Sequence, residues 1–140
     1  MNSLQVNPQV PIRLLLIDND INYLNVLARR LGRRNMSVVP TVSGSRGIQV
    51  LRKEDFDTAV VDLKTEDVDG LELVKIFKKM APAMPVILLA GHGSEHVARQ
   101  GMILGAVDYL TKPCELGELV EKIRQAAAGG TGSQVGRMKD

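Results

Sequence analysis

The sequence has one cysteine and no long hydrophobic run. Cys114 cannot form an internal disulfide bond, which suits a reducing compartment, and we interpret it as a small, partly buried apolar residue rather than a reactive thiol. The first apolar run, residues 14–17, is too short for a signal or membrane segment, and residues 1–11 carry no positive charge. We therefore expect a cytoplasmic protein that does not enter a membrane.

A strong excess of one charge is also missing. The 18 Lys and Arg residues are interspersed with 16 Asp and Glu residues, and the net charge is +2. The charge distribution therefore shows neither a basic patch typical of nucleic-acid binding nor a charged tail that would bind a membrane surface. Four arginines gather near the end of a predicted helix, where we interpret them as a solvated face favoured by the helix dipole: Arg29, Arg30, Arg33 and Arg34. We expect no direct binding of nucleic acid.

The length of 140 residues and the hydrophobic content of 44% suit one domain with a sizeable core. Residues 1–11 form an irregular lead. Residues 129–140 are rich in glycine and show no periodicity, which predicts a flexible tail or a truncated linker. The expected domain therefore spans residues 12–128, and its sequence contains neither an internal repeat nor a helix-turn-helix pattern.

Apolar stretches typical of strands alternate with helical patterns along this domain. Residues 12–17 are almost continuously apolar, as in a strand covered by helices on both faces, and Asp20 is placed to cap the next helix. Further strands are predicted at residues 36–40, 58–61, 85–89 and 107–110, and further helices at residues 44–53, 70–80, 94–104 and 115–128, with Ser94 as a cap. This alternation predicts an α/β fold with a doubly wound, five-stranded parallel sheet.

Polar or small residues follow the predicted strands. In doubly wound sheets, ligands bind beyond the carboxyl ends of the strands. The candidates there are Asp18 and Asn19, Asp62, Ala90 and Gly91, and Lys112 and Pro113. Taken singly, each charged residue among them could be a turn, cap or solvent-facing residue. Their convergence at one edge of the sheet is what predicts a functional site.

Two carboxylates and a lysine at one edge form a coherent chemical site. Asp62 can attack a phosphoryl group as an oxygen nucleophile and form an acyl phosphate. The transfer needs a cation, and Mg²⁺ suits carboxylates, water and phosphate oxygens. We expect Asp18 and Asp62 to supply charge to the metal, and the backbone carbonyl of Lys64 to be a further ligand. Lys112 would pair with Asp62 before the transfer and with the phosphoryl group afterwards.

From about residue 12 to about residue 126, the chain resembles the receiver domains of bacterial response regulators. The matching stretches keep the family's order and spacing: LLLIDND (14–20), AVVDLK (59–64), DGLEL (69–73), PVILL (85–89) and GAVDYLTKP (105–113). The resemblance implies a flavodoxin-like (βα)5 fold with strand order 2-1-3-4-5. It implies four roles: phosphoacceptor for Asp62, metal-site residue for Asp18, phosphate contact for Lys112 and aromatic switch for Tyr109. It also suggests a cis peptide bond between Lys112 and Pro113.

Four further positions lie near the expected site. Asn19 replaces the second member of the family's acidic pair, so we expect weakened Mg²⁺ binding through its amide oxygen. Ala90 stands where the family has Thr or Ser, and it lacks the hydroxyl that would bond the phosphoryl group and draw in the neighbouring loop. Lys64 and His92 occupy positions that in the family modulate the access of water to the acyl phosphate. Solvated loop side chains are the simpler interpretation of both.

The leading hypothesis is a receiver that accepts a phosphoryl group from a sensor histidine kinase on Asp62 and switches a partner-binding surface. Its catalysis would be limited to its own phosphotransfer and self-hydrolysis, so we do not expect an enzyme in the usual sense. Asn19 and Ala90 motivate an alternative, a protein-binding module that signals without phosphorylation. A small flavodoxin-like enzyme or nucleotide binder is disfavoured, because no Gly-x-Gly-x-x-Gly pattern follows the first strand.

The partner surface implied by the resemblance is the face made by residues 94–128. It would meet an unknown downstream protein, an output domain missing from this sequence, or a second copy of the chain. The sequence does not identify the cognate kinase or the signal.

Overall fold

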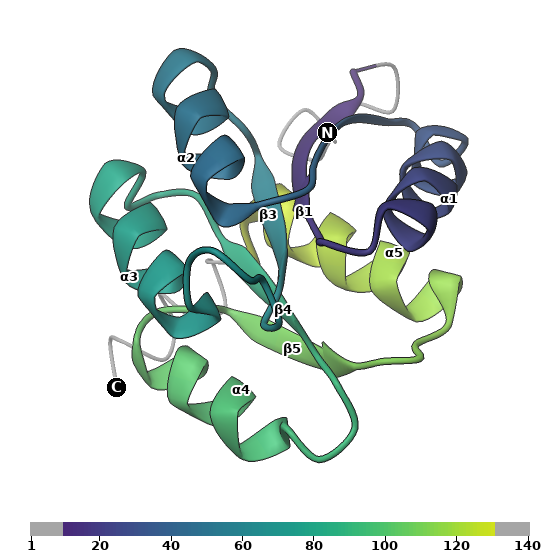
Figure 1. Ribbon diagram of the computed structural model, residues 1–140. Helices are drawn as coiled ribbons and strands as arrows, with labels where there is room; N and C mark the ends of the chain where they lie inside the picture. Colours follow the sequence, from purple (N-terminus) through teal and green to yellow (C-terminus); the bar gives the residue numbers. More distant parts are fainter. Residues whose placement is uncertain (1–9, 131–140) are drawn as a thin grey trace.

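The computed structural model describes residues 10–130, so most of the expected lead and the tail at 131–140 lie outside the described residues. The five strands form one parallel sheet in the order β2-β1-β3-β4-β5. Helices connect the strands and cover both faces of the sheet (Figure 1). The predicted doubly wound fold and the strand order implied by the resemblance are confirmed.

The elements agree closely with the predicted ranges. The strands are β1 (Ile12–Ile17), β2 (Met36–Thr41), β3 (Thr58–Asp62), β4 (Val86–Ala90) and β5 (Asp108–Thr111). The helices are α1 (Ile21–Gly32), α2 (Gly44–Lys53), α3 (Gly70–Met80), α4 (Glu95–Ile103) and α5 (Leu116–Gln125), and a π-helical turn, η2 (Ala126–Gly130), follows α5. Within residues 10–130, no helix is long and apolar enough to cross a membrane.

Several boundaries differ from the prediction, most of them by one residue. Both β4 and β5 lie one residue later than expected, so Ala90 is the last residue of β4 rather than the first residue of the loop. The last helix does not run regularly to Ala128, because α5 ends at Gln125 and η2 contains non-helical backbone angles at Ala128 and Gly129. Gly129 has φ = 87°, a left-handed conformation that glycine adopts without strain and that commonly ends helices.

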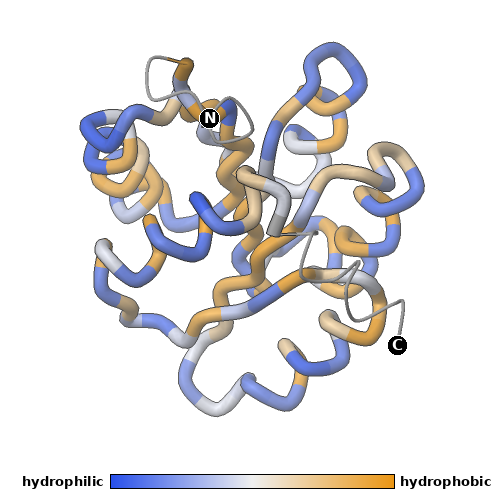
Figure 2. The backbone as a smooth tube through the Cα atoms, turned by 180° about the vertical axis from the view of Figure 1, so that it is seen from behind, coloured by the Kyte–Doolittle hydropathy of each residue, from blue (hydrophilic) through white to orange (hydrophobic). Residues whose placement is uncertain are grey.

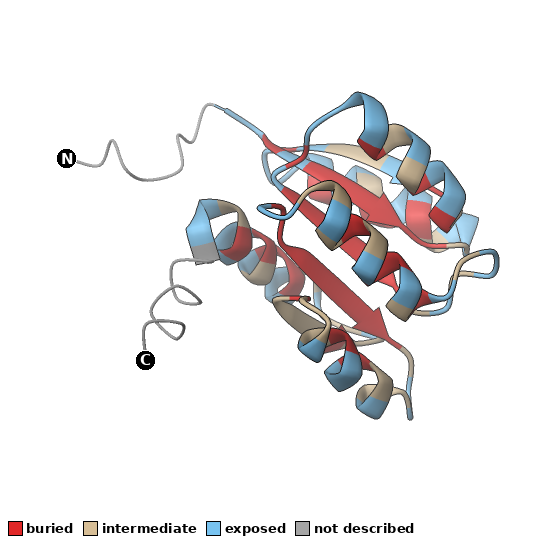
Figure 3. Cartoon of the chain, turned by 90° about the vertical axis from the view of Figure 1, so that its left-hand side faces the viewer, coloured by how far each residue is buried: buried red, intermediate tan, exposed pale blue. Residues whose placement is uncertain are grey.

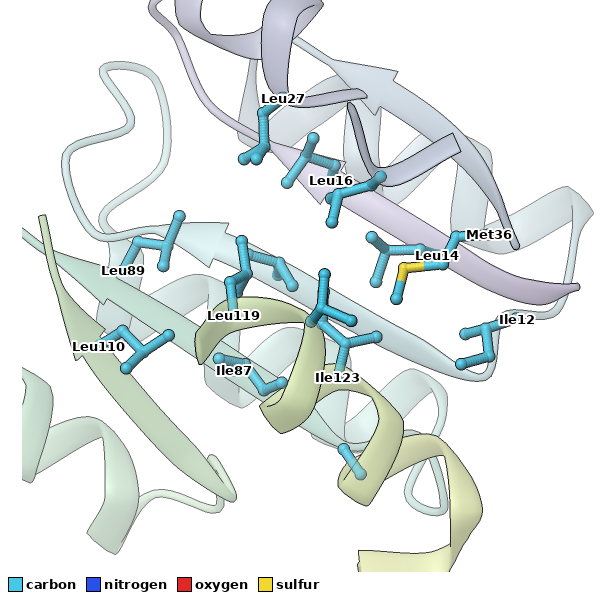
Figure 4. Close-up of a cluster of buried hydrophobic side chains, with 14 of the residues drawn as sticks. Ile12, Leu14, Leu16, Leu27, Met36, Ile87, Leu89, Leu110, Leu119 and Ile123 are labelled. Carbon is cyan, nitrogen blue, oxygen red and sulfur yellow. The ribbon is translucent and has the colours of Figure 1, made fainter. Parts of the chain in front are cut away.

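Two apolar cores lie on opposite faces of the sheet, because successive strand residues point to opposite sides. Under α1 and α5, Leu16 and Leu89 from the sheet lie in one cluster with Leu27 and Leu119 from the helices (Figure 4). The other core surrounds the fully buried Phe77 of α3. The central strands are therefore buried along almost their whole length (Figure 3), and they are mostly hydrophobic when the chain is coloured by hydropathy (Figure 2).

Side-chain caps begin three of the helices. As predicted, Asp20 caps α1, and its Oδ1 accepts a hydrogen bond from the backbone N–H of Tyr23 at 3.1 Å. Ser43 and Asp69 cap α2 and α3 in the same way. Ser94 occupies the N-cap position of α4, but its side chain makes no capping hydrogen bond, so the predicted cap does not form. A side-chain cap typically stabilises a helix by about 1 kcal/mol, and α4 lacks this stabilisation at its first turn.

Candidate functional site

Three charged residues singled out from the sequence meet at the carboxyl edge of the sheet. Asp18 follows β1, Asp62 ends β3 and Lys112 follows β5. The Lys112 ammonium group reaches both carboxylates, because its Nζ lies 3.1 Å from Asp18 Oδ2 and 3.4 Å from Asp62 Oδ2. The peptide bond between Lys112 and Pro113 is cis, as the resemblance suggested. The convergence predicted from strand ends is therefore observed.

Each carboxylate directs one oxygen to Lys112 and the other to a backbone amide. Asp18 Oδ1 accepts a hydrogen bond from the N–H of Asp20 at 2.9 Å, and Asp62 Oδ1 accepts one from the N–H of Lys64 at 3.2 Å. The two aspartates are only 0% and 4% exposed, and carboxylates buried to this extent need such partners. The chain itself thus holds both carboxylates around one cation.

Burial and charge have opposing effects on ionisation in the site. Burial raises the pKa of Asp18; the Asp20 amide opposes this rise and the charge of Asp62 adds to it. Burial alone would lower the pKa of Lys112, but the charges of Asp62 and Asp18 outweigh it, and the net shift is upward. Lys112 is therefore cationic at neutral pH and able to hold an anion at this edge.

Tyr23 belongs to the site, and sequence reasoning missed it. The Lys112 Nζ lies 4.4 Å from the centroid of the Tyr23 ring, within the range of a cation–π interaction. The cap at Asp20 starts α1 so that Tyr23 falls in its first turn, beside the end of β5. No sequence signal marks this role, because it depends on where Lys112 lies in space and not on the spacing between neighbouring residues.

The site has the ligands for a Mg²⁺ ion, though few of them are charged. Asp18 and Asp62 both direct an oxygen toward Lys112 Nζ, so the two carboxylates face the same side of the site. Asn19 is half-buried next to Asp18 and offers a neutral amide oxygen. Within residues 10–130, no group of three or more His, Cys, Asp or Glu side chains converges. The residues fit a Mg²⁺ ion held by two carboxylates, neutral oxygens and water.

The end of β4 is apolar where the family usually has a hydroxyl. The Ala90 side chain is fully buried, and its carbonyl oxygen accepts a hydrogen bond from the Lys112 N–H at 2.8 Å. Lys64 extends from the loop after Asp62 to the loop after Ala90. A methyl group built on Gly91 would lie 3.4 Å from Lys64 Cε and 3.6 Å from its Nζ. The Lys64 side chain therefore lies over Gly91.

The other expected site residues lie outside this cluster of contacts. Tyr109 is partly buried against the core that surrounds Phe77, and His92 is exposed in the loop before α4. Among the described residues, the hydrogen bonds and ion pairs of the site include neither side chain.

Cys114 is half-buried and burial raises the pKa of its thiol, which agrees with its interpretation as a partly buried residue. The four arginines at the end of α1 are exposed, as expected.

Comparison with protein families and curated proteins identifies relatives of this chain. A family model described as "response regulator receiver domain" matches residues 14–124. The transcriptional regulatory protein GlrR of Escherichia coli is 38% identical over 116 residues, which are 83% of this chain and 26% of GlrR. The response regulator protein PilR of Pseudomonas aeruginosa is 31% identical over 114 residues, 81% of this chain and 26% of PilR. The chain spans about a quarter of the length of these relatives.

Solved structures agree with these relatives. A response regulator receiver domain protein from Clostridium thermocellum has a TM-score of 0.81 and 27% identity, covering 86% of this chain and 97% of that one. Full-length FixJ from B. japonicum has a TM-score of 0.80 and 28% identity, covering 86% of this chain and 59% of FixJ. Fold, site and family model agree, and the chain belongs to the response regulator receiver domains of two-component signalling.

Proposed function

We propose that Asp62 accepts a phosphoryl group from a sensor histidine kinase and that the new charge switches a partner-binding surface. One observation carries the proposal. The Lys112 ammonium group is shared between Asp18 and Asp62 at the sheet edge where ligands of doubly wound folds bind. A buried carboxylate nucleophile beside a fixed cation is the arrangement that phosphoryl transfer to a carboxylate requires.

In the transfer, an oxygen of Asp62 forms a bond to phosphorus while the P–N bond of a phosphohistidine breaks. The electron pair of the broken bond stays on the imidazole nitrogen. The N–H of Lys64 orients the carboxylate through Oδ1, and Oδ2 faces Lys112. Lys112 then transfers its contact to the phosphoryl oxygens, because the phosphoryl group carries a charge of about −2 at neutral pH.

A bound Mg²⁺ would neutralise charge on the phosphoryl oxygens during this transfer. Asp18 and Asp62, the Asn19 amide oxygen and the Lys64 carbonyl would hold it. Because Asn19 is neutral, we expect weaker Mg²⁺ binding than in a receiver with a full acidic pair. Attack of water on phosphorus later restores Asp62 and releases inorganic phosphate, and we expect Lys64 and His92 to affect the rate of that step. This self-hydrolysis is the only further reaction proposed.

The proposed partners follow from the family. A cytoplasmic sensor kinase would supply the phosphoryl group, and the face made by residues 94–128, which includes Tyr109, would engage the downstream partner or a second copy of the chain. The relatives are named transcriptional regulators and are about four times as long as this match. We therefore propose that residues 12–128 act as the receiver unit whose output is a separate protein or a further domain. The matches give no support to a phosphorylation-independent module.

Acetyl phosphate, a small phosphoryl donor, tests this function without the kinase. The chain is incubated with acetyl phosphate and Mg²⁺, and its intact mass is measured. We expect the wild type to gain one phosphoryl group and Asp62→Asn to gain none. Asp55→Asn, which changes an exposed aspartate outside the site, serves as a matched control and should behave as the wild type. No mass gain in the wild type at any Mg²⁺ concentration would refute the proposal.

A further inference from the structure

The end of β4 offers no polar side chain to a phosphoryl group on Asp62. Ala90 lies one residue beyond Leu89, the register partner of Asp62, and its side chain is a buried methyl group. The loop of residues 91–94 follows directly and leads into α4. Since the methyl side chain of Ala90 cannot donate a hydrogen bond, another side chain would have to supply the contact that connects an anion on Asp62 to this loop.

Lys64 makes that connection. Its backbone N–H donates a hydrogen bond to Asp62 Oδ1, so the backbone of Lys64 lies beside the carboxylate. Its side chain lies over Gly91, the first residue of the loop. Within residues 10–130, no carboxylate forms an ion pair with its ammonium group. A flexible lysine with an uncommitted charge can turn toward an anion that forms next to its own backbone.

Helix α4, which follows the loop that Lys64 touches, buries few large side chains. Helix α4 buries only Ala98 and Gly101, whereas α3 buries larger side chains such as Leu73 and Phe77. The side chain of Ser94 does not cap α4, and Ile103 is 85% exposed. Small buried surfaces give little hydrophobic stabilisation, so moving α4 costs less than moving its neighbours. A single new interaction at the loop can therefore shift α4.

We propose that Lys64 takes the place of the hydroxyl missing at Ala90 and transmits the phosphoryl charge on Asp62 to the loop of residues 91–94 and to α4. Before phosphorylation, the Lys64 side chain packs on Gly91. Once the phosphoryl group is present, the ammonium group turns onto its oxygens, and the loop moves into the space that the side chain leaves. This inference rests on the proposed function, because it requires an anion bound at Asp62.

Beryllofluoride, a phosphoryl mimic formed from beryllium chloride and fluoride, tests the inference with Mg²⁺ present. Amide NMR shifts of the full chain are recorded for the wild type and for Lys64→Met, whose unbranched side chain is one atom shorter and carries no charge. In the wild type, we expect shifts both next to Asp62 and across residues 91–98. In Lys64→Met, the shift at Leu63 should persist, while those across residues 91–98 should fall to less than about half.

Three further variants make the result specific. Lys64→Arg keeps the charge and should retain most of the response. Lys79→Met removes an exposed lysine on α3 and should match the wild type. Adding Ala90→Thr to Lys64→Met supplies a hydroxyl and should restore the shifts across residues 91–98. An unchanged response of residues 91–98 in Lys64→Met would overturn the role of Lys64 alone. A wild type that shows no shift even beside Asp62 would overturn both this inference and the proposed function.

Discussion

The ammonium group of Lys112 lies between two carboxylates and the face of the Tyr23 ring, with 4.4 Å from Nζ to the ring centroid. The carboxylates of Asp18 and Asp62 attract the cation, and the ring limits where it can move. Tyr23 therefore acts as a positioning residue for the lysine that is expected to contact the phosphoryl group.

Loss of the Tyr23 ring should slow phosphorylation. A cation–π interaction contributes about 0.5 to 1 kcal/mol, so we expect Tyr23→Leu to reduce the rate with acetyl phosphate by roughly two- to fivefold. Tyr23→Phe retains the ring and should stay close to the wild type. NMR of the Lys112 side chain measures the pKa of its ammonium group. This measurement distinguishes a loss of Lys112 positioning from a general loss of structure in Tyr23→Leu. Equal rates in Tyr23→Leu and the wild type would rule out this role.

The ionised carboxylate of Asp18 should reduce the stability of the folded state at neutral pH. Its pKa is raised by burial, so the folded state binds the proton more tightly than the unfolded state does. By linkage, the wild type loses stability as the pH rises from the usual value of 3.8 through the raised pKa. We expect Asp18→Asn to melt at a higher temperature than the wild type near neutral pH, and the difference to shrink near pH 3.8. Thermal melts at both pH values check this, and a lower melting temperature of Asp18→Asn near neutral pH would contradict it.

The fold and the charged part of the site follow from the sequence for clear physical reasons. Continuous apolar runs such as residues 12–17 mark strands covered on both faces, and their ends fix where Asp18 and Asp62 lie. The positions of side chains between elements could not be predicted. Tyr23 reaches Lys112, and Lys64 reaches Gly91, through packing between segments that are far apart or in different loops.

Two differences from the prediction, the missing cap at Ser94 and the early end of α5, have local causes. Ser94 is a suitable cap by residue type, but its backbone angles, φ = −109° and ψ = 18°, lie outside the extended conformation that Asp20 adopts before α1. At the end of α5, alanines favour a helix through Ala128, whereas Gly129 lets the backbone turn. Residue type thus predicts where a helix can end, while the surrounding chain decides its last turn.

Although α4 buries little surface overall, it packs closely on β4 at Gly101, and this glycine gives a stability prediction of unusual sign. Replacing glycine by alanine within a helix normally stabilises it by up to about 1 kcal/mol. At Gly101, however, the added Cβ would clash with Leu88 Cδ1. We expect Gly101→Ala to destabilise the fold by about 1 to 3 kcal/mol, since the buried leucine must move.

Gly117 in α5 provides the matched control for this glycine. No atom lies within 4 Å of a Cβ added there, so Gly117→Ala should leave stability unchanged or raise it by up to about 1 kcal/mol. Urea unfolding of both variants measures the difference. A stabilised Gly101→Ala would show that α4 is not closely packed on Leu88.

Asp67 ties the loop after Asp62 to the start of α2. Its carboxylate accepts hydrogen bonds from the Ser45 hydroxyl and from the backbone N–H groups of Ser45 and Gly44, the latter two at 3.0 Å. These hydrogen bonds lower the pKa of Asp67 to about 2, and the bond from the Ser45 hydroxyl has the largest effect. A lowered pKa means that this contribution to stability is complete above the usual value of 3.8 and is lost as the pH falls through about 2.

We therefore expect Asp67→Asn to unfold at a lower urea concentration than the wild type at neutral pH, with the gap closing as the pH falls from 3.8 toward 2. Glu66→Gln, an exposed neighbour in the same loop, should show no such gap. Urea midpoints across this pH range provide the measurement. A gap that stays constant with pH would exclude the ionised Asp67 as its cause.

The position of the acyl phosphate is the most direct test of the proposed function. After reaction with acetyl phosphate and Mg²⁺, borohydride reduces an aspartyl phosphate to homoserine, and peptide mass spectrometry locates the changed residue. We expect homoserine at position 62 in the wild type and none in Asp62→Asn. Homoserine at another aspartate, or none in the wild type, would contradict it.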